Sequence, residues 1–273
     1  MFNKENEILA ATQKIELQML LEVHKICVDN GITYWLEGGT LLGAIRHGGF
    51  IPWDDDIDIA MDRNNYEKFL KIAQDKLPNG LFLQHPSTDP GFDIQMIKIR
   101  KDGTKIVEKG QNFEEPYHQG IFIDIILCDY FKYGWFVKFM RWGNDFREQR
   151  NKYKKGSLKR ILASIYINGV MWLPWRIWKV MKDYARKHKE LFVCEDYEYL
   201  THTLDFGITH DTKTKDILPV ILGEKIFEGH SFYIPNNPHE YLRCYYDENY
   251  MKMPPLEQRH WHYELIILDT EKG

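Results

Sequence analysis

Four aspartates stand within five consecutive positions of this 273-residue chain, in the segment 53–58 (WDDDID). Residues 56–61 alternate between polar and apolar side chains, which predicts a strand with Asp56 and Asp58 on one face. Carboxylates at this spacing repel one another unless a cation compensates them, and oxygen ligands suit hard divalent cations. We therefore predict a divalent-metal site with Asp56 and Asp58 as ligands and Asp54 as a candidate for a further one.

A glycine turn precedes the acidic segment. Residues 33–36 are typical of a short strand and residues 41–46 of a short helix, with Gly38, Gly39 and Thr40 between them. Backbone N–H groups at the start of a helix bind anions, so these three residues are predicted to hold a phosphate. Arg46 could contact the same substrate or simply anchor the following loop.

An isolated acid lies further along the chain. Asp124 interrupts the otherwise apolar run 120–126, which is typical of a buried strand. A buried carboxylate is costly unless it is paired or metal-bound, so Asp124 is predicted to be the third metal ligand. The alternative is that residues 54–58 form a solvated acidic turn and that Asp124 caps a loop.

Several cationic side chains could bind the negatively charged parts of a phosphate ester. Lys98 and Arg100 share one face of a predicted strand, where they would either stabilise a leaving group or form a solvated face. Arg259 and His260, together with His262, could bind phosphate, or a histidine could act as a general base. Histidines that are merely surface or core residues are the alternative.

The order of elements predicts an α+β fold. Residues 6–30 form an amphipathic helix by their apolar spacing, and strands at 81–84, 94–100, 105–108 and 121–128 are expected to join one mixed sheet flanked by helices. Residues 130–191 change to helical stretches rich in tryptophan and basic residues. We expect a catalytic core over 1–130, an inserted helical, aromatic-rich subdomain over 131–200, and a C-terminal part over 201–273 that completes the substrate site.

The helical part has a composition that suits a membrane surface. Residues 161–175 carry no charge but are too few to span a bilayer, which takes about 20 residues. Basic residues flank the run, and Trp172, Trp175 and Trp178 follow at helical spacing, as in helices that lie in the interface. Packing of these tryptophans within the subdomain is the alternative.

Composition limits the partners. The 36 basic and 40 acidic residues give a formal net charge of -4, which argues against bulk nucleic-acid binding. The four cysteines are scattered, with no metal-binding spacing, and the first residues lack the pattern of a signal peptide. A cytoplasmic protein is therefore expected.

The runs EGGTLLGAIR (37–46) and GFIPWDDDIDI (49–59) strongly resemble the LicD family of phosphorylcholine transferases, and fukutin-related proteins share the motif. Weaker likeness continues through 120–124 and 250–255. The resemblance implies a nucleotidyltransferase-like fold in which Mg²⁺ or Mn²⁺ is held by Asp56, Asp58 and Asp124. It also implies transfer of phosphocholine, or another phosphorylated alcohol, from CDP-choline or a related CDP-alcohol to a sugar hydroxyl of a surface glycan, with release of CMP.

The same resemblance suggests a teichoic acid precursor as the acceptor, lipid-linked at the inner face of a bacterial plasma membrane. Two other readings remain open at this point. One is true nucleotidyl transfer, with pyrophosphate released from a nucleoside triphosphate. The other, from a different class, is a calcium-binding protein that docks on a membrane, although the acidic run lacks the glycine spacing of an EF-hand loop.

Overall fold

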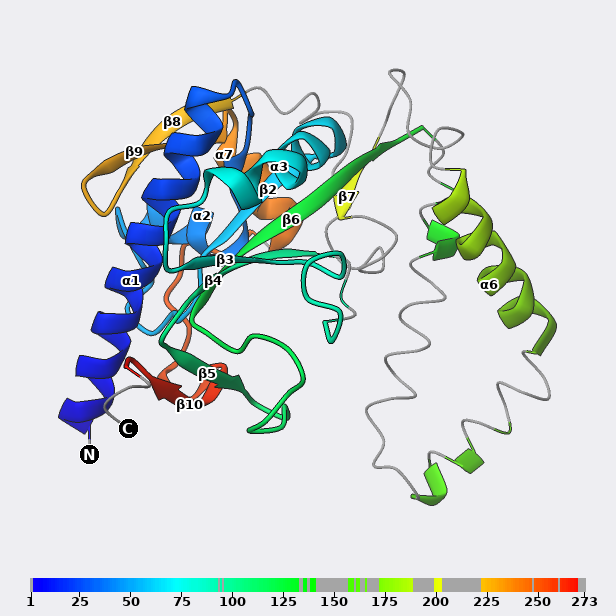
Figure 1. The fold of residues 1–273 in the computed structure, drawn as a ribbon. Coiled ribbons are helices and arrows are strands. Elements are labelled where there is room, and N and C mark those ends of the chain that lie inside the picture. Colours follow the sequence, from blue (N-terminus) through cyan, green and yellow to red (C-terminus); the bar gives the residue numbers. More distant parts are fainter. Residues whose placement is uncertain are drawn as a thin grey trace. The chain divides into compact units, whose positions relative to one another are not determined.

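The computed structural model describes residues 2–92, 94, 96–132, 135–136, 138–140, 157–159, 161–162, 165, 172–188, 199–202, 222–246, 248–259 and 261–269. The chain divides into two compact units, which are treated separately below (Figure 1). Met1–Leu127 and Val220–Gly273 form the first unit, and Cys128–Pro219 form the second. The functional division anticipated near residues 130 and 200 stays a prediction.

The first unit is built around a mixed sheet with helices packed on it, which confirms the predicted fold class. Its strands run in the order β1 (Trp35–Leu36), β2 (Asp58–Asp62), β6 (Phe122–Phe131), β4 (Ile97–Lys101) and β3 (Leu81–Gln84). The main helices are α1 (Phe2–Asp29), α2 (Gly38–Arg46) and α3 (Arg63–Lys76), and both α2 and α3 contact β2. β2 and β6, the strands that carry the predicted metal ligands, are therefore neighbours.

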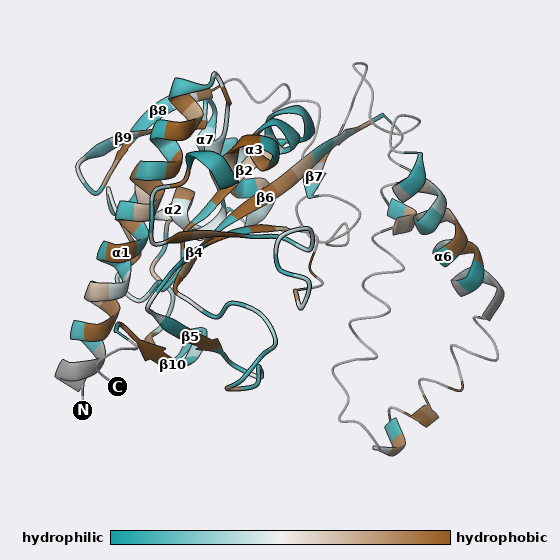
Figure 2. Ribbon diagram, in the orientation of Figure 1, coloured by the Kyte–Doolittle hydropathy of each residue, from teal (hydrophilic) through white to brown (hydrophobic). Residues whose placement is uncertain are grey.

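The predicted opening helix is confirmed as α1. Its buried positions recur every three or four residues and include Leu9, Glu16, Leu20 and Val23. Figure 2 shows the resulting interleaving of hydrophobic and hydrophilic segments along this helix. Burial of such a stripe, rather than intrinsic propensity, supplies most of the stability of a helix in a protein.

Three boundaries differ from the sequence-based expectation. The acidic segment is extended, but strand pairing begins only at Asp58, so Asp56 precedes β2. α2 begins at Gly38, so the glycines form its first turn rather than a loop before it. The expectation that 105–108 joins the main sheet is wrong, because β5 (Lys105–Glu108) pairs antiparallel with β10 (Tyr263–Ile267) in a separate two-stranded sheet.

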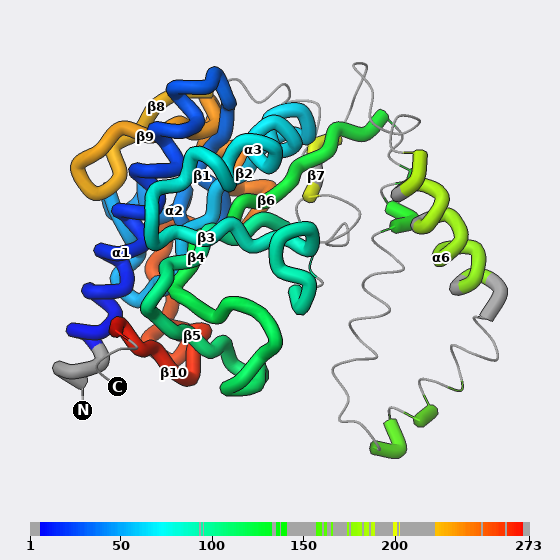
Figure 3. Tube along the Cα trace, in the orientation of Figure 1, coloured from blue at the N-terminus to red at the C-terminus, as the bar shows by residue number. Residues whose placement is uncertain are grey.

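The C-terminal segment returns to the first unit, as the orange-to-red path in Figure 3 shows. It contains the hairpin β8 (Leu222–Phe227) and β9 (His230–Pro235), then α7 (Pro238–Tyr245) and a short 3₁₀ helix, η3 (Leu256–Gln258). α7 packs against α2, and β10 then pairs with β5. The last 50 or so residues thus complete the unit that holds the acidic segment.

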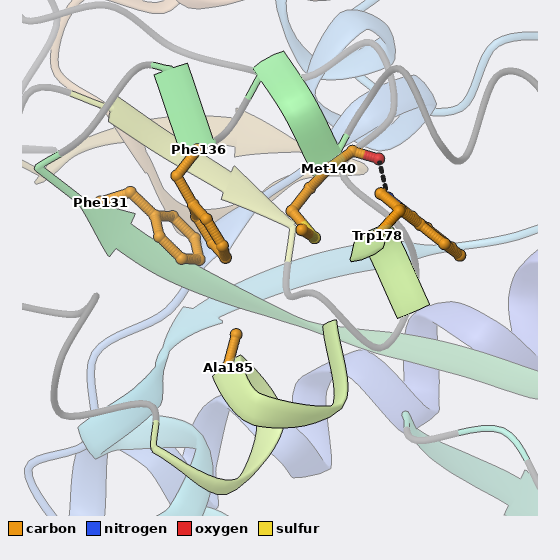
Figure 4. Close-up of a cluster of buried hydrophobic side chains, with 5 residues drawn as sticks. All are labelled: Phe131, Phe136, Met140, Trp178 and Ala185. Carbon is orange, nitrogen blue, oxygen red and sulfur yellow. Dashed lines mark hydrogen bonds between the residues drawn. The ribbon is translucent and has the colours of Figure 1, made fainter. Parts of the chain in front are cut away.

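In the second unit, the last residues of β6 pair antiparallel with β7 (Tyr199–His202). Helix α6 (Trp172–Lys187) buries Trp178 and Ala185 in a cluster with Phe131, Phe136 and Met140 (Figure 4). The Trp178 indole N–H donates to the Met140 carbonyl at 3.1 Å. Trp178 is therefore a core residue of this unit.

Most of the remaining predicted helical stretch lies outside the described residues, as do the side chains of Trp172 and Trp175. Among the helices that are described, none combines the length and the apolar character that crossing a membrane requires.

Candidate active site

The backbone of Asp58 is fixed from two sides by the glycine segment. Its N–H donates to the Thr40 hydroxyl oxygen at 2.8 Å, and its carbonyl accepts from the Glu37 N–H at 3.0 Å. Thr40, predicted to hold a phosphate, therefore also positions a predicted metal ligand. These two hydrogen bonds join the start of α2 to the start of β2.

The two glycines allow the carboxylates to approach the first turn of α2. A Cβ atom on Gly38 would lie 3.3 Å from Asp58 Oδ2, and one on Gly39 would lie 2.7 Å from Asp54 Oδ2. Gly38 also has a positive φ of 51°, which favours glycine. A larger residue at position 39 would force the Asp54 side chain to move, so glycines here let the acidic segment pack closely on α2.

Burial and mutual repulsion raise the pKa values of the aspartates. Burial, reinforced by Asp56, raises the pKa of Asp54 to about 8. Burial, reinforced by Asp124, raises the pKa of Asp56 to about 6. The pKa of Asp58 is also raised, by burial first and then by Asp56 and Asp124. The charge of Asp124 thus acts on both Asp56 and Asp58, although these three carboxylates do not form a group whose ligand atoms all lie within 4.8 Å of one another.

Asp124 reaches this cluster from the adjacent strand. Its backbone N–H donates to the Ile57 carbonyl at 2.9 Å, which joins β6 to the acidic segment. Lys98 Nζ lies 2.8 Å from Asp124 Oδ1 and donates to Oδ2 at 3.0 Å, while also lying 3.5 Å from the centre of the Phe122 ring. Burial raises the pKa of Asp124, and Lys98 opposes that rise. The predicted cation Lys98 is therefore an ion-pair partner of a predicted ligand.

Arg100 does not extend toward the cluster in the same way. Its guanidinium is buried, donates from Nε to Gln84 Oε1 at 2.7 Å and from Nη1 to the Gly120 carbonyl at 2.8 Å, and lies over the Phe122 ring. These contacts tie β4, β3 and the start of β6 together. The structure gives Arg100 a place in the fold, and a contact with substrate phosphate stays a prediction.

The aspartate whose role the sequence left open, Asp55, has a long-range partner. It is fully buried, and its carboxylate accepts from the His262 backbone N–H at 2.7 Å and contacts His262 Nδ1 at 2.8 Å. The Tyr263 hydroxyl donates to the Asp55 carbonyl at 2.6 Å. The hydrogen bond that the ring donates to Asp55 raises the pKa of His262 to about 9, so this ring carries a positive charge beside the aspartates at neutral pH.

A second buried network connects the glycine segment to α7. The Glu37 carboxylate accepts from Trp35 Nε1 and from the Tyr241 hydroxyl, both at 2.6 Å. Trp35 Nε1 also lies 3.0 Å from the Tyr241 oxygen. No feature of the local sequence signals this network, because Tyr241 is 204 residues away from Glu37.

A cavity of about 550 Å³ opens beside the acidic segment. Gly39 and Asp54 form part of its wall, and the other lining residues are Leu42, Arg46, Ile51, Trp53, Tyr246, Asn249, Tyr250, Lys252, Met253, Pro254 and Gln258. Two predicted cationic phosphate-binding residues also lie at or near it. Arg46 is part of the wall and donates to the Tyr250 carbonyl at 2.9 Å, and Arg259 stacks 4.5 Å from the centre of the Trp53 ring. His260 lies outside the described residues.

The donor atoms of this site fit a hard divalent cation. Carboxylates from the acidic segment and from β6 lie partly buried, and Asp124 Oδ1 is shielded from solvent with Lys98 Nζ at 2.8 Å. Asp55, Asp56 and His262 form the one group in the described part of the chain whose ligand atoms all lie within 4.8 Å of one another. Oxygen-rich sites of this kind suit Mg²⁺ or Mn²⁺.

Comparison with known proteins agrees with this geometry. Residues 31–88, which contain the glycine segment and the acidic segment, match the LicD/FKTN/FKRP nucleotidyltransferase domain. The chain is 29% identical to the lipopolysaccharide cholinephosphotransferase LicD of Haemophilus influenzae, over 93% of this chain and 96% of that protein. It is 64% identical to the human ribitol 5-phosphate transferase FKRP over 31 residues, which are 11% of this chain and 6% of that protein.

The fold, the paired glycine and acidic segments, and the likeness over nearly the full length lead to one assignment. Residues 31–88 form a domain similar to the LicD/FKTN/FKRP nucleotidyltransferase domain, and the chain is a phosphotransferase.

Proposed function

We propose that this phosphotransferase moves phosphocholine from CDP-choline to a sugar hydroxyl of a surface glycan and releases CMP. The observation that carries the proposal is the position of the acidic segment, which packs against Gly38 and Gly39 and contributes Asp54 to the wall of the cavity. The full-length relative, named a cholinephosphotransferase that acts on lipopolysaccharide, supports choline and a glycan as the two substrates. A teichoic acid precursor remains our proposal for the acceptor, on the family resemblance.

A divalent cation, Mg²⁺ or Mn²⁺, belongs to the proposal. When bound, it would neutralise charge on the phosphate oxygens of the donor and of the departing CMP. Asp56, Asp58 and Asp124 would hold it, since burial raises the pKa values of Asp56 and Asp58 and the charge of Asp124 raises both further. Lys98 keeps Asp124 in place through the ion pair described above.

The cavity supplies groups suited to the donor. Trp53 and Tyr246 offer aromatic faces on which a pyrimidine base can stack, and the amides of Asn249 and Gln258 can hydrogen-bond to the edge of a base. Arg46 adds positive charge for the diphosphate. The acceptor hydroxyl would attack the phosphorus nearer to choline, so that its bond to the CMP oxygen breaks and phosphocholine passes to the sugar.

The competing reaction in the same fold is nucleotidyl transfer, in which pyrophosphate leaves. A variant of the leading proposal is that the donor is another CDP-alcohol. A relative that shares the motif is named a ribitol 5-phosphate transferase, which supports this variant. The leaving group and the donor preference separate the three.

The first test is CMP release from CDP-choline with an extracted glycan acceptor. We expect release in Mg²⁺, loss of at least about 100-fold on chelation with EDTA, and recovery when Mg²⁺ is added back, because the charge on the leaving group is then stabilised again. CDP-ribitol and CTP serve as matched alternative donors. Release of CMP that EDTA leaves unchanged would refute the metal dependence, and pyrophosphate as the product would favour nucleotidyl transfer.

We also propose that the second unit contacts a membrane surface through helix α6. Its exposed large apolar side chains are Ile177, Val180 and Tyr184, which are spaced to form one stripe, and Val180 is 67% exposed. Basic residues dominate the charges of this helix, with five against a single acid. An exposed apolar stripe beside basic side chains suits a bilayer with anionic lipids. Trp178, buried in the cluster of Figure 4, is not part of this surface.

Sedimentation with liposomes tests the membrane contact. We expect the wild-type chain to bind vesicles that contain phosphatidylglycerol. An Ile177→Ser/Val180→Ser/Tyr184→Ser variant should lose at least about tenfold in partitioning, because burying each apolar side chain in the bilayer contributes about 1 kcal/mol or more of binding free energy. A Val28→Ser/Ile226→Ser variant removes exposed apolar side chains from the first unit and is the control. Equal partitioning of all three proteins would exclude this surface.

A further inference from the structure

Helix α1 carries a buried carboxylate that the proposed chemistry has not used. Glu16 is fully buried, and neither of its carboxylate oxygens has a hydrogen-bond partner among the described residues. Glutamate is almost never fully buried unless it is paired. Ordinary burial of an amphipathic helix would place an apolar residue here, so the acid needs an explanation.

The position of Glu16 connects it to the acidic segment. Gln13, one turn earlier on the same face of α1, donates from Nε2 to the Asp54 carbonyl at 2.8 Å. Burial raises the pKa of Glu16, and the negative charges of the four aspartates of the acidic segment, Asp56, Asp55, Asp54 and Asp58, raise it further. This face of α1 therefore packs under the acidic segment and adds a fifth carboxylate to it.

Five carboxylates at one place are unstable without positive charge. An unpaired buried carboxylate costs several kcal/mol, and each neighbouring aspartate increases that cost. The His262 ring is already bonded to Asp55, and Lys98 is already paired with Asp124. Neither cation contacts Glu16 in the described structure. A divalent cation in the acidic segment would compensate both the aspartates and Glu16.

We propose that Glu16 is a positioning carboxylate of the cation site, contributed by helix α1 from outside the glycine and aspartate motif. Its negative charge strengthens cation binding by the acidic segment, and the bound cation in turn stabilises the buried carboxylate. The inference rests on the proposed metal dependence. It assigns to the opening helix a role in the site, in addition to its packing on the first unit.

The test compares the wild type with Glu16→Gln, which keeps the shape and removes the charge. We expect a calorimetric titration with Mn²⁺ alone to show that the variant binds Mn²⁺ at least about tenfold more weakly than wild type, because a negative charge near the cation is lost. Without metal, the variant should unfold at the same or a higher temperature than wild type, since a buried repulsion is removed. The rise in unfolding temperature on adding Mn²⁺ should be smaller in the variant.

Two further variants define the outcome. Glu22→Gln changes an exposed glutamate on the same helix and should leave Mn²⁺ affinity unchanged. Glu16→Asp keeps the charge and should bind Mn²⁺ more tightly than Glu16→Gln. Equal affinity of wild type and Glu16→Gln, or a metal-free Glu16→Gln chain less stable than wild type, would show that Glu16 is a neutral structural residue and overturn the inference, while the proposed function stands. A wild-type chain that binds no Mn²⁺ would refute the metal dependence as well.

Discussion

Replacing Asp58 with asparagine is expected to lower the rate of CMP release by about 10²–10³-fold, the range found when one preorganised electrostatic group is removed from an active site. The backbone of residue 58 is held by Thr40 and by Glu37, so the asparagine side chain should occupy the same space. The Asp58 carboxylate packs closely on the first turn of α2, since a Cβ atom on Gly38 would lie 3.3 Å from Asp58 Oδ2. The substitution therefore tests the charge and not the shape.

The same strand provides a matched control. Asp62, at the other end of β2, caps α3 by accepting from the Asn65 N–H at 2.9 Å. Asparagine caps helices about as well as aspartate, so Asp62→Asn should keep both activity and stability. Mn²⁺ titration of both variants separates loss of the cation from loss of turnover. Activity of Asp58→Asn within a few-fold of wild type, with Asp62→Asn unchanged, would remove Asp58 from the reaction.

The local pattern of the sequence predicted most elements of the first unit. β3 and β5 have the predicted bounds. Alternation also predicted the orientation of the acidic segment, since Ile57 and Ile59 are fully buried on one side. Such signals depend on neighbours a few residues apart, and they survive wherever the element is packed on a core.

Contacts between distant residues could not be predicted in this way. The separation of β5 from the main sheet depends on its pairing with β10, more than 150 positions later in the chain. The bond between Asp55 and His262 spans 207 residues, so the sequence left Asp55 as a supporting residue of open role. Only the structure identifies it as the anchor of the C-terminal segment at the site.

The sequence-based prediction did not include Glu16, although the local sequence around it carries a signal. It lies on the apolar stripe of α1, four residues before Leu20 and seven before Val23, both of which are fully buried. An acid on the buried face of an otherwise regular amphipathic helix is as informative as Asp124 in its apolar strand. The same reasoning that singled out Asp124 could have been applied to the helix.

Replacing Lys98 with methionine is expected to destabilise the metal-free chain by about 3–5 kcal/mol, the cost of leaving one member of a buried ion pair without its partner. The side chains of Lys98 and Asp124 are only 5% and 14% exposed, so water cannot replace the lost charge. Methionine keeps most of the aliphatic length that packs on Phe122. Urea unfolding in EDTA measures the difference in free energy.

Adding Asp124→Asn to Lys98→Met tests whether the loss in free energy of unfolding comes from the unpaired charge on Asp124. In Lys98→Met/Asp124→Asn the buried negative charge is removed as well, so the double variant should regain at least about half of the stability that the single variant lost. Adding Mn²⁺ should recover part of the loss in Lys98→Met, because a cation held by Asp56 and Asp58 would compensate Asp124 in place of the lysine. The double variant lacks that carboxylate and should gain less from Mn²⁺. A single variant as stable as wild type in EDTA would mean that Asp124 is already neutral without metal, and that Lys98 contributes packing alone.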